Sequence, residues 1–314
     1  MPLSHKNLYQ TIQNIKATYD LTPVDRTLLV MPLFHVHGLL AGFLAPLGSA
    51  GSLIMPPRFS ASEFWRDFVT HKANWYTAVP TMHQILLRND FPSPMPTIRF
   101  VRSCSSPLSP TVHKQLETIF NAPVLEAYAM TEAAHQMTSN PLPPAQHKPG
   151  SVGIAQGLDL QIMDDEGNSL PQGKIGEVCV LGANVTSGYL GDPKVVASPF
   201  TESGYLRTGD QGYLDEEGYL FLTGRIKELI NKGGEKISPI EIDNLLAQHP
   251  KVLEAVSFAI DDELYGQNVA VAIALREGCE LSAEELLSWF GDRAAKFKIP
   301  KKVTSLNPFF REPC

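Results

Sequence analysis

Segments that look like β-strands alternate with segments that look like helices over the first half of the chain. The strand-like segments are short and rich in β-branched and aromatic residues, whereas the helix-like segments repeat apolar side chains at helical spacing. In order, these segments are residues 26–31, 60–71, 75–79, 81–88, 98–102, 109–120 and 124–125. Strands that alternate with helices are typical of a parallel α/β sheet, so we expect an α/β protein.

The pattern changes after residue 140. Residues 158–162 and 177–181 alternate apolar with polar side chains, and turns rich in Gly and Asp at 165–167 and 215–218 separate such strands. This part of the chain predicts an antiparallel subdomain that is barrel-like or sandwich-like.

A third pattern begins near residue 225. Its expected elements are a helix at 238–248, strands at 252–260 and 268–275, and a helix at 282–295. Ser282 and Glu285 have the spacing of a capping box at the start of the last helix. We therefore expect two domains: a large one over residues 1–224 and a small α+β one over residues 225–314.

Composition narrows the class of protein. Asp and Glu total 33 against 26 Lys and Arg, and this acidic balance disfavours a nucleic-acid partner. The cysteines form no Cys-x-x-Cys pair, so a zinc site built on them and a disulfide framework are not expected. Residues 36–55 carry no charge, but Gly, Pro and Ser interrupt them. We expect a buried core helix followed by a turn and a strand, with no membrane span.

The sequence Tyr128-Ala-Met-Thr-Glu132 comes directly after a predicted buried strand. In parallel sheets, ligands bind beyond the carboxyl ends of the strands. A Thr hydroxyl there suits a phosphate oxygen, and a Glu carboxylate suits Mg²⁺. The alternative is structural, with Thr131 capping a helix and Glu132 in its first turn.

Two more motifs suit a nucleotide. Residues 103–107, Ser-Cys-Ser-Ser-Pro, end a predicted strand, and their small side chains would let a flat ring approach the backbone. In Thr208-Gly-Asp210 the carboxylate of Asp210 could accept hydrogen bonds from ribose hydroxyls. A plain turn and an Asx turn are the respective structural alternatives.

Residues 224–236 combine charge, glycine and a short apolar run near the expected domain junction. Arg225 could hold phosphate or ribose oxygens, and the Gly233-Gly234 pair allows close approach of a thin ligand. The alternative is a solvated β-hairpin. His35 and His37 could form a metal pair, but no third ligand is spaced nearby, so histidines of a pocket or core are favoured.

In combination these motifs resemble the adenylate-forming superfamily, the AMP-binding synthetases and ligases. Residues 128–132, 208–210 and 224–227 match three of its core motifs in order. Further runs resemble the 4-coumarate-CoA-ligase-like branch, and most closely its oxalate-CoA ligases: residues 32–38, 75–80, 102–105, 126–135, 139–143 and 231–239. The resemblance extends over nearly the whole chain.

The resemblance implies an acyl-CoA synthetase that uses ATP, Mg²⁺ and CoA. A carboxylate would attack ATP to give an acyl-adenylate, and CoA would then displace AMP. Thr131 would hold the α-phosphate and Glu132 would bind the metal, with Arg225 on ribose or phosphate and His35 at the acyl site. The residues implied to frame the nucleotide are Ser103, Cys104, Ser105, Glu126, Ala127, Tyr128 and Asp210.

The remaining implied roles concern the acid and CoA. Lys227 would be the hinge between the domains. Gly233, Gly234 and Lys236 would border the CoA channel. A small dianion such as oxalate needs a short polar pocket, for which the hydrogen-bonding candidates are His37, Ser105 and His135.

The chain also departs from the family pattern. The family's phosphate loop precedes the segment matching residues 2–7, and its adenylation lysine follows the segment matching residues 298–303. Since neither has a counterpart here, we expect a fragment or truncated product with impaired adenylation. The resemblance implies the cytoplasm or the peroxisome as the compartment, and no targeting signal is visible in this sequence.

Three alternatives to an oxalate-CoA ligase stay open. One is a CoA ligase for an aromatic or fatty acid. Another is an amino-acid adenylation domain. The third is a fragment that binds adenylate, or a partner, without catalysis.

Overall fold

The computed structural model describes residues 1–191 and 198–306. It divides into two compact units. The first comprises residues 1–208 and 212–222, and the second comprises residues 209–211 and the chain from residue 223 onward.

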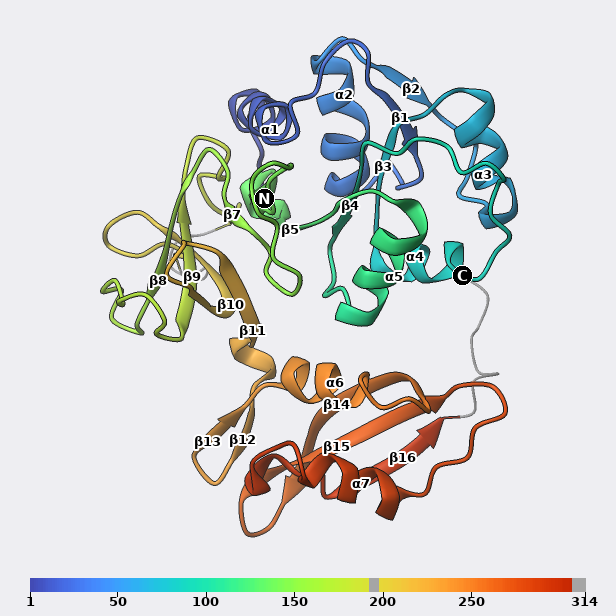
Figure 1. Ribbon diagram of the computed structural model, residues 1–314. Helices are drawn as coiled ribbons and strands as arrows, with labels where there is room; N and C mark the ends of the chain where they lie inside the picture. Colours follow the sequence, from blue (N-terminus) through green and yellow to red (C-terminus); the bar gives the residue numbers. More distant parts are fainter. Residues whose placement is uncertain (192–197, 307–314) are drawn as a thin grey trace. The chain divides into compact units, whose positions relative to one another are not determined.

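A seven-stranded sheet organises the first unit (Figure 1), in the order β2-β1-β3-β4-β5-β6-β7. Its strands are β1 (Arg26–Leu29), β2 (Ser52–Ile54), β3 (Trp75–Ala78), β4 (Phe100–Cys104), β5 (Val124–Met130), β6 (His135–Ser139) and β7 (Ile154–Ala155). The five strands from β2 to β5 run parallel, whereas β6 and β7 pair antiparallel. The predicted parallel α/β sheet is confirmed.

Helices cover both faces of this sheet, because neighbouring residues of each strand point to opposite sides. Trp75 and Phe100 pack with Tyr19 on one face, and Phe100 stacks on Tyr19 at 5.1 Å between ring centroids. Tyr76 and Val101 pack on the other face against α3, α4 and α5. The helices are α1 (His5–Thr18), α2 (Ala45–Gly48), α3 (Ala61–Thr70), α4 (Pro80–Leu86) and α5 (Pro110–Phe120).

The uncharged stretch at residues 36–55 forms a helix, a turn and the strand β2, as expected. Its first part is a π-helix, η1 (His37–Leu44), in which the N–H of Ala45 bonds to the carbonyl of Leu40. Gly38 is required there, since a Cβ atom would lie 2.2 Å from the carbonyl oxygen of Pro32. π-Helical turns are rare and often accompany functional sites.

A four-stranded sheet follows, in the order β11-β10-β9-β8. Its strands are β8 (Asp159–Met163), β9 (Gly176–Leu181), β10 (Leu206–Leu214) and β11 (Leu220–Arg225). β8 and β9 pair antiparallel, and both expected turns are present, with Gly167 bonding back to Asp164 and Gly218 to Asp215. Leu160, Val178 and Leu206 are among the side chains of its core.

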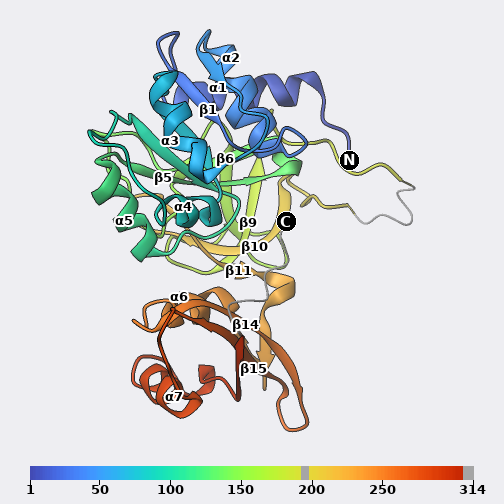
Figure 2. The same cartoon turned by 90° about the vertical axis from the view of Figure 1, so that its right-hand side faces the viewer.

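The second unit is an α+β module around a five-stranded sheet, β13-β12-β15-β14 with β16 beside β15. Figure 2 shows α6 and α7 along the same side of β14 and β15, and residues of both helices share one apolar core with these strands. The capping box at Ser282 is confirmed, but α7 ends at Gly291, four residues before the predicted end at residue 295.

The elements of this unit are η3 (Ile226–Glu228), β12 (Ile230–Lys232), β13 (Glu235–Ile237), α6 (Pro239–Leu246), β14 (Val252–Asp262), β15 (Gly266–Leu275), α7 (Ala283–Gly291), η4 (Lys296–Lys298) and β16 (Lys302–Leu306). In the described part of the whole chain, no helix combines the length and the apolar character that crossing a membrane requires.

Candidate functional site

The carboxyl ends of β3, β4 and β5 lie side by side and bring the predicted nucleotide residues of the first unit together. Ser103 is opposite Glu126 in the register, and Cys104 is opposite Ala127. β5 runs to Met130, so Tyr128 lies within the strand rather than after it. This edge is where parallel sheets bind ligands.

Ser105 leaves the end of β4 with a positive φ of 77° and is exposed. The carboxylate of Glu126 is instead turned into the protein. It accepts hydrogen bonds from the backbone N–H of Gly150 at 3.0 Å and from Nδ1 of His113 at 3.1 Å. Only the backbone of Glu126 is therefore left to face a base.

A buried arginine, Arg102, lies on β4 beside the predicted acid-binding residues. Its guanidinium is fully enclosed, and no carboxylate of the described residues forms an ion pair with it. Its partners are all neutral: Oη of Tyr19 (2.7 Å), Oγ1 of Thr77 (3.1 Å), Nε2 of His37 (3.3 Å), Nε2 of His135 (3.1 Å) and Oε1 of Gln136 (3.2 Å). We call these six residues the Arg102 cluster.

Arg102 fixes the protonation of both histidines. A guanidinium has donors only, so Nε2 of His37 and Nε2 of His135 must accept. Burial, and after it the positive charge of Arg102, holds the pKa of both imidazoles well below the ordinary value, so both rings are neutral at physiological pH. The proton of each ring is therefore on Nδ1.

These two Nδ1–H groups differ in their surroundings. Nδ1 of His37 lies 3.1 Å from Oγ of Ser105. Nδ1 of His135 is buried and has no hydrogen-bond partner among the described residues. The two rings stack at 5.3 Å between centroids. The structure thus brings His37, Ser105 and His135 together around a buried cation, with one donor unpaired.

His35 and Glu132 are more accessible. Nδ1 of His35 accepts the backbone N–H of His37 at 3.1 Å, and its ring is exposed. Thr131 and Glu132 lie in a short 3₁₀ turn, η2 (Thr131–Ala133). Met130 is the N-cap residue of this turn, so Thr131 does not cap it. The carboxylate of Glu132 accepts a hydrogen bond from Oη of Tyr189 at 2.7 Å, and this bond raises the pKa of Tyr189 to about 12.

The second unit holds the remaining predicted residues. Asp210 lies within β10 rather than in an Asx turn, and its carboxylate pairs with Nε of Arg225 at 3.0 Å. Lys227 is exposed in η3. Gly233 and Gly234, with φ of 61° and 95°, form the turn of the β12–β13 hairpin.

Lys236 lies on the β13 strand of this hairpin, opposite Asn231. Its side chain is exposed. The segment forms an exposed hairpin that presents the predicted CoA-binding residues at its surface.

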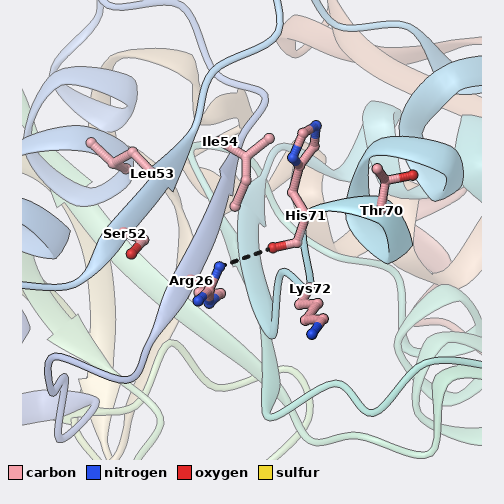
Figure 3. Close-up of a pocket in the computed structure, with 7 residues that line it drawn as sticks. All are labelled: Arg26, Ser52, Leu53, Ile54, Thr70, His71 and Lys72. Carbon is pink, nitrogen blue, oxygen red and sulfur yellow. Dashed lines mark hydrogen bonds between the residues drawn. The ribbon is translucent and has the colours of Figure 1, made fainter.

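A pocket elsewhere in the first unit contains none of the predicted site residues (Figure 3). It is lined by Arg26, Ser52, Leu53, Ile54, Thr70, His71 and Lys72. Arg26 and Ser52 are the first residues of β1 and β2, so this pocket lies at the amino edge of the parallel sheet. Ligands of such sheets bind at the opposite edge.

Sequence reasoning missed Arg102 as a functional residue. It quoted the residue only as part of a motif, although an arginine inside a buried strand is itself a signal, since such a charge needs a partner. Gln136 and Thr77 were missed because polar residues of this size occur throughout the chain.

The model of the AMP-binding enzyme family matches residues 1–190, and the model of the AMP-binding enzyme C-terminal domain matches residues 241–309. The chain belongs to the AMP-binding enzyme family. The recognition of this family from the sequence motifs is confirmed.

Within the AMP-binding enzymes, the chain is similar to two oxalate–CoA ligases. It is 54% identical over 304 residues to that of Saccharomyces cerevisiae, covering 96% of this chain and 56% of the relative. It is 50% identical over 309 residues to that of Arabidopsis thaliana, covering 96% and 60%. The chain thus spans somewhat less than two thirds of these relatives.

A solved AMP-binding enzyme also matches the fold. The ATP-bound crystal structure of MatB from Rhodopseudomonas palustris superposes with a TM-score of 0.91 at 31% identity. The match covers 97% of this chain and 61% of that protein.

Proposed function

We propose that this chain is the greater part of an AMP-forming ligase that joins oxalate to CoA. The observation that carries the proposal is Arg102, a buried cation with neutral partners, beside the unpaired Nδ1–H of His135. A buried charge without a counter-charge is costly, and an anionic ligand would offset that cost. The names of the two ligases at 50% identity or more support the same substrate.

The chemistry of the cluster selects among carboxylic acids. One carboxylate of a dianion must stay free to attack ATP, while the other needs a fixed cation. Arg102 supplies that cation, and His135 and Ser105 supply hydrogen bonds that orient the acid. An aromatic or fatty acid would instead place an apolar surface against the donors of His135 and Ser105 and leave the charge of Arg102 without a counter-charge, which favours the dicarboxylate over these alternatives.

The reaction has two steps. A carboxylate oxygen attacks the α-phosphorus of ATP, forming a C–O–P linkage and releasing pyrophosphate. The sulfur of CoA then attacks the carbonyl carbon, forming the thioester and releasing AMP, while the thiol proton leaves to solvent. Catalysis of such a transfer is chiefly positioning and stabilisation of phosphate charge.

Residues of the first unit suit the adenylation step. Thr131 presents an exposed hydroxyl after β5, where it would hold the α-phosphate. Glu132 offers a partly exposed carboxylate, the ligand type that Mg²⁺ prefers. When bound there, Mg²⁺ would neutralise phosphate charge. The backbone at residues 103–105 and 126–128 would frame adenine, and His35 would border the acyl site.

Residues of the second unit suit ribose and CoA. The carboxylate of Asp210 would accept ribose hydroxyls and Arg225 would contact ribose or phosphate. Gly233, Gly234 and the exposed Lys236 would border CoA, with Lys227 as the hinge. The compartment, cytoplasmic or peroxisomal, stays a prediction.

The test is a panel of acids assayed with the intact protein that carries this chain. We expect exchange of labelled pyrophosphate into ATP, and AMP release with CoA, to be strongest with oxalate. Malonate, succinate and 4-coumarate are the comparison acids. Exchange that is strongest with 4-coumarate, or AMP binding without any exchange, would reject the proposal in favour of the aromatic or non-catalytic alternative.

A further inference from the structure

Three potential metal ligands, none of them Glu132, meet beside α5. His113 and Glu117 are four residues apart on α5, and so share one face of the helix. His147 comes from the segment after β6. Each of the three side chains offers one ligand atom, and these three atoms all lie within 4.8 Å of one another. Nε2 of His147 is 2.7 Å from Oε1 of Glu117, and Nε2 of His113 is 3.5 Å from the same oxygen.

The orientation of His113 points to a bound cation. The imidazole is 1% exposed, and its Nδ1 donates to the carboxylate of Glu126 at 3.1 Å. In the neutral ring Nε2 then carries a lone pair, and this atom is buried without a hydrogen-bond partner. It faces the carboxylate of Glu117, so two electron-rich atoms confront each other. A proton or a metal ion between them removes the repulsion.

The distances suit a tetrahedral metal. Ligands about 2.1 Å from Zn²⁺ lie roughly 3.4 Å from each other at the tetrahedral angle. The separation of 3.5 Å between His113 and Glu117 already has this value. His147 would move outward by less than about 1 Å to reach it.

Neighbouring groups hold the proposed ligands in place through hydrogen bonds, as is usual around a metal ion. A histidine that binds zinc commonly donates its other ring nitrogen to a carboxylate, which fixes the tautomer. Glu126 does this for His113 and is itself held by the N–H of Gly150. Glu117 also accepts the N–H of Val124 at 3.1 Å. Two carboxylates would balance the charge of a divalent ion.

We propose that His113, Glu117 and His147 bind Zn²⁺, with Glu126 orienting His113. Imidazole nitrogens favour zinc over Mg²⁺, so the site is distinct from the carboxylate proposed for the nucleotide-bound metal. The ion would fasten the segment that contains His147 to α5 and to the start of β5. Its role would be structural, with a water molecule in the fourth position.

The experiment measures zinc binding by the intact protein that carries this chain. After treatment with a chelator and without nucleotide, we expect one equivalent of Zn²⁺ to bind in the presence of excess Mg²⁺, with a rise in Tm of about 5 °C at saturation. Cobalt substitution should give the absorption of a tetrahedral ion without the thiolate-to-metal band that cysteine ligands produce.

Two variants and a control decide between a metal and a proton. His147→Gln, which changes a partly exposed side chain, should weaken Zn²⁺ binding about 10- to 100-fold and abolish the Tm shift. Glu117→Gln should do the same. His71→Gln, at an exposed histidine, should bind zinc as the parent does. A parent chain that takes up no zinc, or variants that bind it equally, would overturn the proposal and leave a proton shared within the cluster.

Discussion

Nη2 of Arg102 donates to Nε2 of His135 at 3.1 Å, and through this bond it sets which nitrogen of the imidazole carries the proton. The nitrogen of His135 that carries the proton, which we propose donates to the acid, is thus determined by a residue on another strand. Substitution of Arg102 by an uncharged residue would remove a cation and would also leave either nitrogen of His135 free to carry the proton.

Arg102→Lys tests that dependence. Lysine keeps the charge but loses the fork of donors, so we expect kcat/KM for oxalate to fall at least 100-fold, about 2.7 kcal/mol, with little change in KM for ATP. The matched control is Arg99→Lys on the same segment, where the arginine pairs with Asp25 at 3.1 Å. Equal losses in both variants would show that Arg102 acts through stability alone. Thermal melts of both proteins accompany the kinetics.

The neutral histidines predict a pH dependence of stability. In the folded protein the pKa values of His37 and His135 lie well below 6.5, whereas the unfolded chain protonates both near that value. Stability is therefore complete above about pH 6.5 and falls as the pH drops below it, by up to about 1.4 kcal/mol per pH unit for each histidine.

Denaturant titrations between pH 5 and 8 measure this slope. His135→Gln should reduce it. His5→Gln, at an exposed residue of α1, is the control and should leave it unchanged. A slope that is the same in all three proteins would contradict the assignment of neutral rings.

Glu132→Gln removes the negative charge of this side chain but keeps an oxygen that can accept the hydrogen bond from Tyr189. Because Glu132 raises the pKa of Tyr189 to about 12, loss of the negative charge should return that pKa toward its ordinary value of about 10. Tyrosine-labelled NMR can follow this change without an assay of activity. The same variant should raise KM for magnesium–ATP about tenfold if Glu132 binds the metal. Tyr189→Phe identifies the resonance.

Asp243 in α6 provides a test in the second unit. Burial raises its pKa to about 6, although its carboxylate accepts both the N–H and the hydroxyl of Ser257. The folded state therefore binds the proton more tightly than the unfolded chain, so stability falls as the pH rises from about 4 to 6 and stays lower above that.

Asp243→Asn keeps an oxygen for Ser257 and removes the charge. We expect it to stabilise the protein at pH 8 by roughly 1–3 kcal/mol and to flatten the slope between pH 4 and 6. Glu241→Gln, on the same helix but exposed, serves as the comparison. Destabilisation by Asp243→Asn at pH 8 would mean that the ionised carboxylate is favoured in the fold.

The parallel sheet could be predicted because each of its strands and helices is encoded locally, by alternation, apolar spacing and caps. The ends of the elements could be predicted less well. Ser282 marks the start of α7 through its capping box, but the helix ends at Gly291 with Asp292 as its C-cap, and neither residue gives a clear stop signal.

The Arg102 cluster could not be assembled from the sequence pattern, because its bonds join distant segments. Tyr19 and Arg102 are 83 positions apart, and Arg102 and His135 are 33 apart. Family resemblance supplied His37, Ser105 and His135, and the arginine that bonds to the two histidines emerged only with the fold. The same holds for the proposed zinc ligands, since Glu117 and His147 are separated by 30 positions.

The π-helix at His37–Leu44 has a consequence for how this part of the chain could evolve. Its hydrogen bonds span five residues rather than four, so the segment contains one residue more than an ordinary helix of the same form would use. Deletion of Ala41 should let the segment relax to an α-helix, in which each residue turns by about 100° instead of the smaller step of a π-helix. The side chains after the deletion would then take new angular positions relative to His37. A single-codon deletion could thus change what packs against His37 while leaving every residue of the Arg102 cluster unmutated.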